Sequence, residues 1–286
     1  MDAENGYLLA NQQIQAGTRF EALAVLFDPS TFRHLREIGV ASGWRCWEVG
    51  AGGLSVPHWL AAHVGPIGLV VATDIDTSWL TRSGAGAGLD HLHILRHDVG
   101  VEDPPAADLD LVHVRLVLTH VPQRSRALTS MISALRPGGW LLIEEADPGL
   151  QPLICPDDHG PAQHLANRLR HGFRTLMSGR EADLAYGRTL PRLLRDHGLT
   201  DVAADAYFPI TAPACATLER ATVEQIRDRL IGAEIATAAE IDQHLDNIAT
   251  GRLPDLATSP MISAWGRKPV TGVRPSPLRV AQGDQR

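Results

Sequence analysis

The chain has 286 residues, of which 44% are hydrophobic and 21% are charged, and its formal net charge is -7. This is the composition of an ordinary globular protein, and it gives no sign of disorder except at the very end of the chain. The acidic balance and the lack of any run of Lys or Arg argue against a nucleic acid as partner, because nucleic-acid binders usually carry a basic patch.

The three cysteines, Cys46, Cys155 and Cys215, are widely spaced and odd in number, which is typical of a reducing compartment. The N-terminal residues lack the basic and apolar regions of a signal peptide. No stretch approaches the ~18 consecutive apolar residues that a membrane-spanning helix needs. We therefore expect a cytoplasmic protein without a membrane partner, either a monomer or a homodimer.

Residues 7–35 carry apolar side chains at helical spacing and are predicted to form two helices, broken at Pro29, with Ser30 as the cap of the second. From residue 44 onward, short apolar strands alternate with helices. Such unbroken apolar strands predict a parallel sheet covered by helices on both faces. The strands are expected at 44–49, 69–74, 91–98, 110–116 and 140–144, and the helices between them at 55–63 and 124–135.

After Asp147 the pattern is less regular. Further helices are expected at 164–177, 189–197, 222–231 and 239–248, and further strands at 202–208 and 261–266. The predicted organisation is an N-terminal helical cap (1–43), a cofactor-binding core (44–147), a lid or substrate insertion (148–197), a C-terminal part of the core with a helical substrate-side insertion (198–268) and a mobile tail (269–286).

A glycine-rich turn, Gly50–Gly53, joins the first strand of the core to a helix. Glycines there let the backbone approach a ligand closely. The next strand ends at Asp74, whose carboxylate can accept hydrogen bonds from two ribose hydroxyls, and the third ends at Asp98, near an adenine amino group. Glu48 lies two residues before the turn. A carboxylate there suits a ligand with an ammonium group and is unfavourable beside the pyrophosphate of NAD.

Five motifs between residues 44 and 147 resemble those of the class I S-adenosylmethionine-dependent methyltransferases. Within that class they are most similar to small-molecule enzymes related to the quinone-biosynthesis methyltransferases. The motifs are Glu48-x-Gly50-x-Gly52, Asp74, His97-Asp98-Val99, the segment 110–122 and the segment 135–144.

The resemblance implies an α/β fold: a Rossmann-like, doubly wound, seven-stranded sheet whose last strand is antiparallel, with a helical N-terminal cap and a lid insertion. It implies S-adenosylmethionine as cofactor and methyl transfer to O, N or C of a small-molecule acceptor, such as a phenol, a quinone precursor or a natural product. The cofactor-binding residues that it implies are Tyr7, Arg19, Glu48, Gly50, Gly52, Asp74, Ile75, Asp98, Val99 and Arg115.

His120, just after the fourth strand, is the first candidate for a general base, since an ordinary histidine pKa of ~6.5 suits proton removal near neutrality. The alternative is a histidine that packs or hydrogen-bonds locally. Glu144 and Glu145 end the fifth strand, and because side chains alternate along a strand only one of them is expected to face the pocket. Glu145 is the second catalytic candidate; the alternative is a solvated or capping acid.

Three other interpretations of the sequence are considered. His91, His93 and His97 share one face of a strand, but no fourth ligand is evident and no metal site is expected. A NAD(P)-dependent oxidoreductase fits the glycine turn and Asp74 but not Glu48. The third interpretation is a homologue that binds S-adenosylmethionine without transferring its methyl group, because Leu54 stands where the family often has a third glycine.

Overall fold

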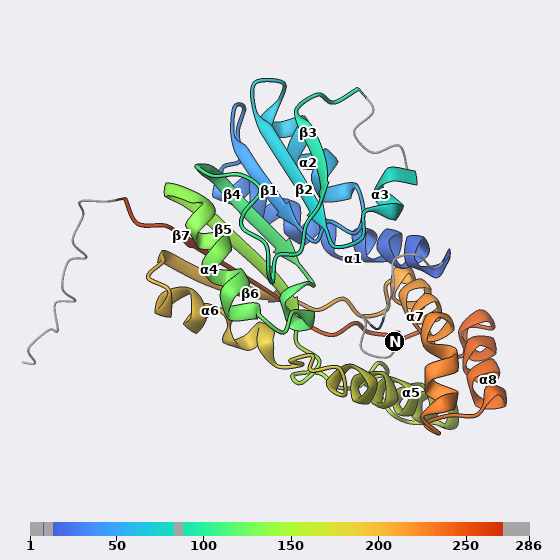
Figure 1. The fold of residues 1–286 in the computed structure, drawn as a ribbon. Helices are drawn as coiled ribbons and strands as arrows, with labels where there is room; N and C mark the ends of the chain where they lie inside the picture. The colour runs from blue at the N-terminus through green and yellow to red at the C-terminus, as the bar shows by residue number, and fades with distance from the viewer. Residues whose placement is uncertain (1–7, 9–13, 83–87, 271–286) are drawn as a thin grey trace, which may run out of the picture.

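The computed structural model describes residue 8 and residues 14–82 and 88–270. The tail expected to be mobile, 269–286, therefore lies almost entirely outside the described residues. Seven strands form the central sheet (Figure 1). They are β1 Arg45–Val49, β2 Leu69–Asp74, β3 Leu92–Arg96, β4 Leu109–Arg115, β5 Leu135–Ala146, β6 Thr200–Tyr207 and β7 Met261–Arg267.

The strand order is β3-β2-β1-β4-β5-β7-β6. Strands β1 to β5 pair in parallel, whereas β7 is antiparallel to both β5 and β6. This confirms the predicted doubly wound sheet with an antiparallel last strand. Because β1 pairs with both β2 and β4, the order reverses between β1 and β4. Ligands of such sheets bind at the carboxyl ends of the strands beside this reversal.

Helices cover both faces of the sheet (Figure 1). Apolar side chains of α1 and α2 pack on one face, and those of α4 and α6 pack on the other. Helices α5, α7 and α8 pack on one another around a separate apolar cluster. The helices are α1 Ile14–Ile38, α2 Ser55–Val64, α3 Ser78–Arg82, α4 Arg124–Ala134, α5 Pro161–Ser178, α6 Tyr186–Asp196, α7 Pro213–Gly232 and α8 Ala238–Ala249, with a short 3₁₀ turn, η1, at Leu118–His120.

The prediction of two N-terminal helices broken at Pro29 is wrong, because α1 runs through Pro29 as one helix. Proline has no N–H to donate to the carbonyl of Val25, but Val25 is 69% exposed, so water can solvate that carbonyl. Buried side chains on both sides of the proline, Phe27 and Leu35, hold the helix against the protein. The expected cap Ser30 consequently lies inside the helix.

The two helices of the segment 148–197, which was expected to form a lid, pack in two different places. Buried Tyr186, Leu190 and Leu194 share one face of α6 and join the same core cluster as α4 and β4. That helix therefore covers the sheet rather than its carboxyl edge. Only α5, from the first part of the segment, packs with α7 and α8 beyond the ends of the strands (Figure 1).

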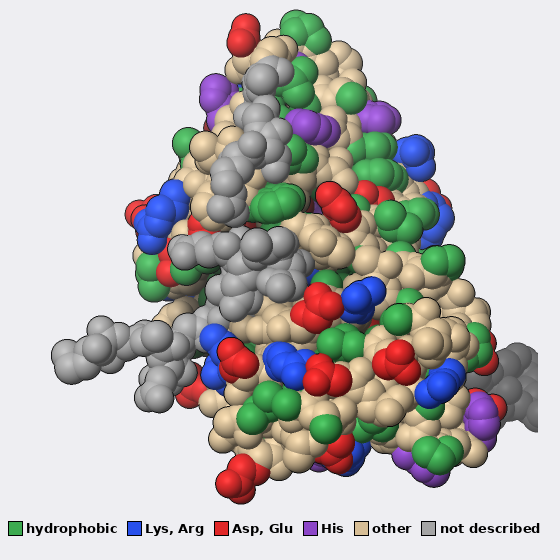
Figure 2. Space-filling model, turned by 90° about the vertical axis from the view of Figure 1, so that its right-hand side faces the viewer, with side chains coloured by type: hydrophobic (Ala, Val, Ile, Leu, Met, Phe, Trp, Pro, Cys, Tyr) green, Lys and Arg blue, Asp and Glu red, His purple; other side chains and the backbone are tan. Residues whose placement is uncertain are grey.

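On the face drawn in Figure 2, Lys and Arg side chains stand among Asp and Glu side chains rather than gathering in one basic area. Among the helices described, none is both long and apolar enough to cross a membrane.

Candidate functional site

A cavity of about 340 Å³ opens at the carboxyl edge of the sheet. Its walls come from the loops that follow β1, β2, β3 and β4 and from helices α1, α5 and α7. Of the twelve residues expected from the sequence, ten line this cavity: Arg19, Gly50, Gly52, Asp74, Ile75, Asp98, Val99, Arg115, His120 and Glu145. Glu48 lies elsewhere, and Tyr7 is outside the described residues.

The glycine turn has the backbone that only glycine adopts easily. Gly50 and Gly52 have φ values of 64° and 56°. A Cβ at Gly50 would lie 2.2 Å from Val117, and one at Gly52 would lie 2.9 Å from Phe20 of α1. Leu54, in place of a family glycine, has φ -95°, so its side chain imposes no backbone strain. The turn is thus fixed between α1 and the loop after β4.

Asp74 connects the ends of β1 and β2. Its Oδ2 accepts a hydrogen bond from the Gly52 N–H at 2.9 Å, and its Oδ1 accepts one from the Asp76 N–H at 2.9 Å. Burial raises the pKa of Asp74, although these N–H groups oppose that change. The next residue, Ile75, is apolar, 56% exposed and at the cavity wall. A buried carboxylate beside an apolar surface suits a ribose joined to a flat base.

Asp98 and Val99 lie just beyond β3 on the same side of the cavity. Asp98 Oδ1 accepts a hydrogen bond from the Gly100 N–H at 2.8 Å, and the Asp98 N–H donates to Glu102 Oε2 at 2.5 Å. These bonds fix the turn and leave Val99 buried in the cavity wall. The turn therefore presents a carboxylate and an apolar side chain next to each other.

Arg19 brings a buried positive charge to the cavity from α1. The residue is 6% exposed, and its guanidinium carbon lies 5.2 Å from the centre of the Phe20 ring. Its Nε and Nη2 are buried and have no hydrogen-bond partner among the described residues. Burying such donors without a partner is unfavourable, so the position suits a ligand with a carboxylate.

Glu145, the second catalytic candidate, lines the cavity as predicted, while its neighbour Glu144 points to the opposite face of the sheet. The oxygens of Glu145 accept hydrogen bonds from the N–H groups of Val117 and Leu118, at 3.0 and 2.6 Å, and from Thr119 Oγ1 at 2.8 Å. Burial raises the pKa of Glu145 to about 7 although these donors oppose it. These bonds hold the η1 turn at the end of β5, and the catalytic role expected of Glu145 stays a prediction.

His120 ends that turn and faces the cavity. Burial lowers its pKa to about 4, and the positive charges of Arg19 and Arg124 add to the effect. The imidazole is therefore neutral at physiological pH and can accept a hydrogen bond or a proton from a group in the cavity.

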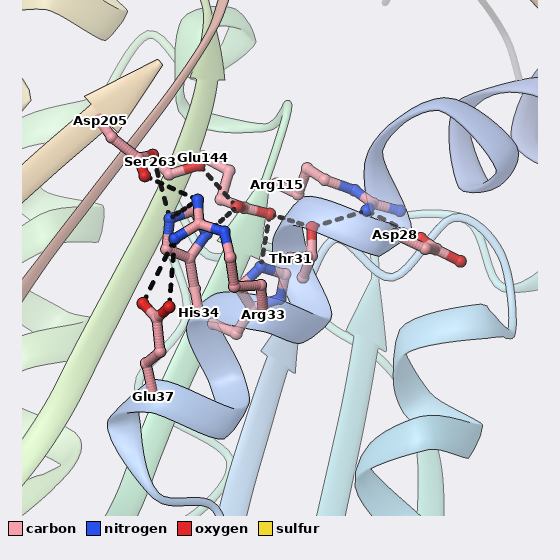
Figure 3. Close-up of polar contacts among 10 residues, drawn as sticks. Asp28, Thr31, Arg33, His34, Glu37, Arg115, Glu144, Asp205 and Ser263 are labelled. Atoms are coloured by element: carbon pink, nitrogen blue, oxygen red, sulfur yellow. Dashed lines mark hydrogen bonds and ion pairs between the residues drawn. The ribbon is translucent and has the colours of Figure 1, made fainter. Parts of the chain in front are cut away.

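Arg115, expected to bind the cofactor, lines the cavity but is already engaged. Its Nη1 donates to Asp28 Oδ1 at 2.9 Å and to Thr31 Oγ1 at 3.0 Å (Figure 3). Both acceptors belong to α1. Arg115 therefore holds this helix against the carboxyl end of β4, which keeps Arg19 and Phe20 at the cavity.

The expected contact between Glu48 and an ammonium group is wrong for this structure. Side chains alternate along β1, so Val49 lines the cavity and Glu48 points to the opposite face, beneath α1. Glu48 is 2% exposed, and its Oε2 lies 2.5 Å from Nδ1 of His113. It therefore takes part in a buried ionic network instead of the cavity.

This network joins α1 to the middle of the sheet (Figure 3). Glu144 accepts hydrogen bonds from Thr31 and from Ser263 Oγ, the latter at 2.7 Å, and its carboxylate lies within 3.4 Å of His113 and His34. Burial alone would raise the pKa of Glu144, but the two histidines hold it well below its usual range. Burial would likewise lower the pKa of His113, yet Glu48 and Glu144 raise it to about 9.

The raised pKa of His113 predicts a pH dependence of stability. A folded-state pKa of about 9, above the ordinary ~6.5, means that the stabilisation is complete below pH ~6.5 and is lost as pH rises through about 9. Between these values the free energy of unfolding is expected to fall by about 1.4 kcal/mol per pH unit from this group. Urea unfolding at several pH values measures the slope. The variant His113→Asn should flatten it, and an equal slope in both proteins would contradict the assignment.

Some cavity residues were not predicted from the sequence. They come from α5 and α7, where helical spacing is visible in the sequence but does not reveal which face meets a cavity. They include Arg170, Phe173, Arg174, Met177, Leu218 and Thr222.

The three histidines considered for a metal site have other surroundings. His91 Nε2 lies 3.0 Å from the carbonyl oxygen of Ala61, and His97 Nε2 lies 2.8 Å from that of Asp103. Within residues 14–82 and 88–270, no group of three or more His, Cys, Asp or Glu side chains is arranged to hold a metal ion.

The sheet order, the antiparallel β7, the glycine turn and the acids that follow β2 and β3 are similar to those of class I, S-adenosylmethionine-dependent methyltransferases. Comparison with known families shows that residues 47–141 match the methyltransferase domain family.

Among characterised relatives, methyltransferase str3 of Strobilurus tenacellus is 32% identical over 144 residues, which cover 46% of this chain and 47% of that protein. The ubiquinone/menaquinone biosynthesis C-methyltransferase UbiE of Ectopseudomonas mendocina is 31% identical over 122 residues, covering 41% and 47%. The chain spans about half the length of the curated relatives it matches. The solved structure of Haemonchus contortus phosphoethanolamine N-methyltransferase 2, with S-adenosylhomocysteine, has a similar fold, with a TM-score of 0.58 and 16% identity over 94% of this chain and 61% of that one.

Proposed function

We propose that this protein is an S-adenosylmethionine-dependent methyltransferase that methylates O, N or C of a small-molecule acceptor. The observation that carries the proposal is the arrangement of charges around the cavity. Asp74 ends β2 and Asp98 lies just beyond β3. The guanidinium of Arg19, with two donors unpartnered among the described residues, enters from α1. A nucleoside that carries an amino acid needs this combination of carboxylates and a cation.

In this proposal each cavity residue has a distinct task. Asp74 accepts hydrogen bonds from the two ribose hydroxyls, and Ile75 and Val99 enclose the adenine. Asp98 accepts a hydrogen bond from the adenine amino group. Arg19 pairs with the methionine carboxylate while the backbone of Gly50–Gly53 passes beneath it. Glu145 and Arg115 hold the surrounding walls.

The bound cofactor would supply an activated sulfonium methyl group, so the chain has to position the acceptor and exclude water. The apolar side chains of α5 and α7 close the cavity above the strand ends. His120, neutral at physiological pH, accepts a hydrogen bond or proton from the group to be methylated. Because its pKa is lowered, it is a weak base and serves chiefly to orient that group.

The strand order of the sheet argues against the alternative, a NAD(P)-dependent oxidoreductase. The usual dinucleotide-binding order is 3-2-1-4-5-6, whereas here the antiparallel β7 lies between β5 and β6. The argument from Glu48 against NAD no longer applies, since Glu48 faces away from the cavity. Strand order therefore replaces it as the discriminating observation.

Thermal unfolding with S-adenosylmethionine, S-adenosylhomocysteine or NADH tests the proposal. A ligand at ~100 times its dissociation constant stabilises the folded state by about 2.7 kcal/mol, which gives a clear rise in melting temperature. We expect this rise with the two sulfur compounds and none with NADH. A rise with NADH alone would overturn the proposal. Stabilisation by the sulfur compounds without turnover on a broad panel of phenols and amines would instead identify a non-transferring homologue.

A further inference from the structure

One face of α5 forms the cavity wall opposite the sheet. Its cavity-lining residues follow helical spacing, which places them on the same side of the helix. They are Arg170, Phe173, Arg174 and Met177. Leu218 and Thr222, one turn apart on α7, lie beside this face. This part of the cavity thus combines an apolar lining with two arginines.

The first arginine is electrically compensated. Arg170 Nη2 donates to Glu219 Oε2 at 2.7 Å, and Glu219 is 2% exposed. The other oxygen of Glu219 lies 3.2 Å from Nε2 of the fully buried His244. Glu219 is therefore the counter-ion of Arg170, and its two oxygens already contact Arg170 and His244.

The second arginine is not compensated within the described chain. Arg174 follows Arg170 by one turn, and its Nε is buried without a hydrogen-bond partner among the described residues. The acids that line the cavity, Asp74, Asp98 and Glu145, belong to the sheet side, where β2, β3 and β5 end. A buried donor on a cation is unfavourable unless a partner satisfies it.

We propose that Arg174 binds an anionic group, a carboxylate or a phosphate, on the methyl acceptor. The apolar body of the acceptor packs against Phe173, Met177 and Leu218. Arg19 has a different place, on α1 beside Phe20 and the glycine turn, and is assigned to the cofactor. This inference rests on the proposed methyltransferase function and specifies its substrate class: an amphipathic small molecule with one anionic end.

Binding of matched charged and neutral probes tests the inference, with S-adenosylhomocysteine present at saturation. The probes are benzoate, phenylacetate and cinnamate, each beside its amide, and phenyl phosphate beside phenol. At least one anionic probe is expected to bind about tenfold or more tightly than its neutral partner. The reason is that hydrogen bonds between a guanidinium and an anion are charge-assisted and therefore strong. If this preference for the anion is larger for a carboxylate than for phenyl phosphate, the anionic group of the acceptor is a carboxylate. If it is larger for phenyl phosphate, the group is a phosphate. If no anionic probe exceeds its neutral partner, the inference is overturned.

Three variants assign the preference to Arg174. Arg174→Met is expected to abolish it while retaining side-chain length, and Arg174→Lys is expected to keep most of it. Arg168→Met is the matched control, because Arg168 lies on the same helix, is 46% exposed and pairs with Glu240 outside the cavity. A preference that survives in Arg174→Met would overturn the inference.

Stabilisation by S-adenosylhomocysteine, measured on the same proteins, separates the two proposals. Arg174→Met should retain it, since Arg174 is assigned to the acceptor. If S-adenosylhomocysteine fails to stabilise the unchanged protein, the methyltransferase proposal fails, and the preference for anionic probes is then measured on the protein alone.

Discussion

Replacement of Asp74 by alanine is expected to weaken the binding of S-adenosylhomocysteine by about 100-fold or more. The substitution removes the acceptor for the Gly52 N–H, 2.9 Å away, and the two hydrogen bonds proposed for the ribose. A hydrogen bond to a charged group contributes about 1.5–3 kcal/mol, so the loss of two exceeds ~3 kcal/mol, a factor of over 100 in affinity. Isothermal titration calorimetry measures the change.

Two further variants make the Asp74 result interpretable. Asp74→Asn keeps an acceptor for the glycine turn, so it should bind with an intermediate affinity and remain folded. Asp103→Ala removes an acid whose side chain is 99% exposed, and it should bind like the unchanged protein. If Asp74→Ala binds within about threefold of the unchanged protein, a difference of ~0.7 kcal/mol, Asp74 does not hold the ribose.

Replacement of Glu144 by alanine is expected to lower the free energy of unfolding by about 3–5 kcal/mol. The substitution leaves His113 and His34 buried with less compensating charge and removes the acceptor of the Thr31 and Ser263 hydroxyls. Removing one partner of a buried pair costs more than the pair itself contributes, because the remaining charge stays in a medium of low dielectric constant. Urea unfolding at neutral pH measures the loss.

An exposed pair in the same region is the matched control for Glu144. Glu37 is 57% exposed and pairs with Arg33 on α1, so Glu37→Ala should change the free energy of unfolding by about 0.5 kcal/mol or less (Figure 3). Where Glu144→Ala does not fold, Glu144→Gln retains the shape and one acceptor and should lose less. A loss under ~1 kcal/mol for Glu144→Ala would show that the network contributes little to stability.

The core of the fold was predictable because its signals are local. The sequence between residues 44 and 99 directly shows these signals, which are unbroken apolar segments, a glycine turn and an acid after each of two predicted strands. Since parallel strands end at the same edge of a sheet, the same signals also predict that Gly50, Gly52, Asp74 and Asp98 lie close together.

The helices that surround the core were less predictable. A proline usually ends a helix, but the side chains of α1 that pack on the sheet and pair with Arg115 keep it continuous through Pro29. The segment after Asp147 shows helical spacing in both α5 and α6, yet one lines the cavity and the other packs on the sheet. Spacing defines an apolar face but not the surface that it meets.

Sequence by itself determined the doubly wound sheet, the glycine turn and the acids at the strand ends, since each depends on residues close together in the chain. Tertiary structure alone decided that Glu48 pairs with His113 instead of facing the cavity, and that Glu145 holds a turn. It also decided that the Arg174 Nε has no partner among the described residues while Arg170, one turn away, is paired. These outcomes depend on charges that are distant in sequence and meet only when helices pack on the sheet.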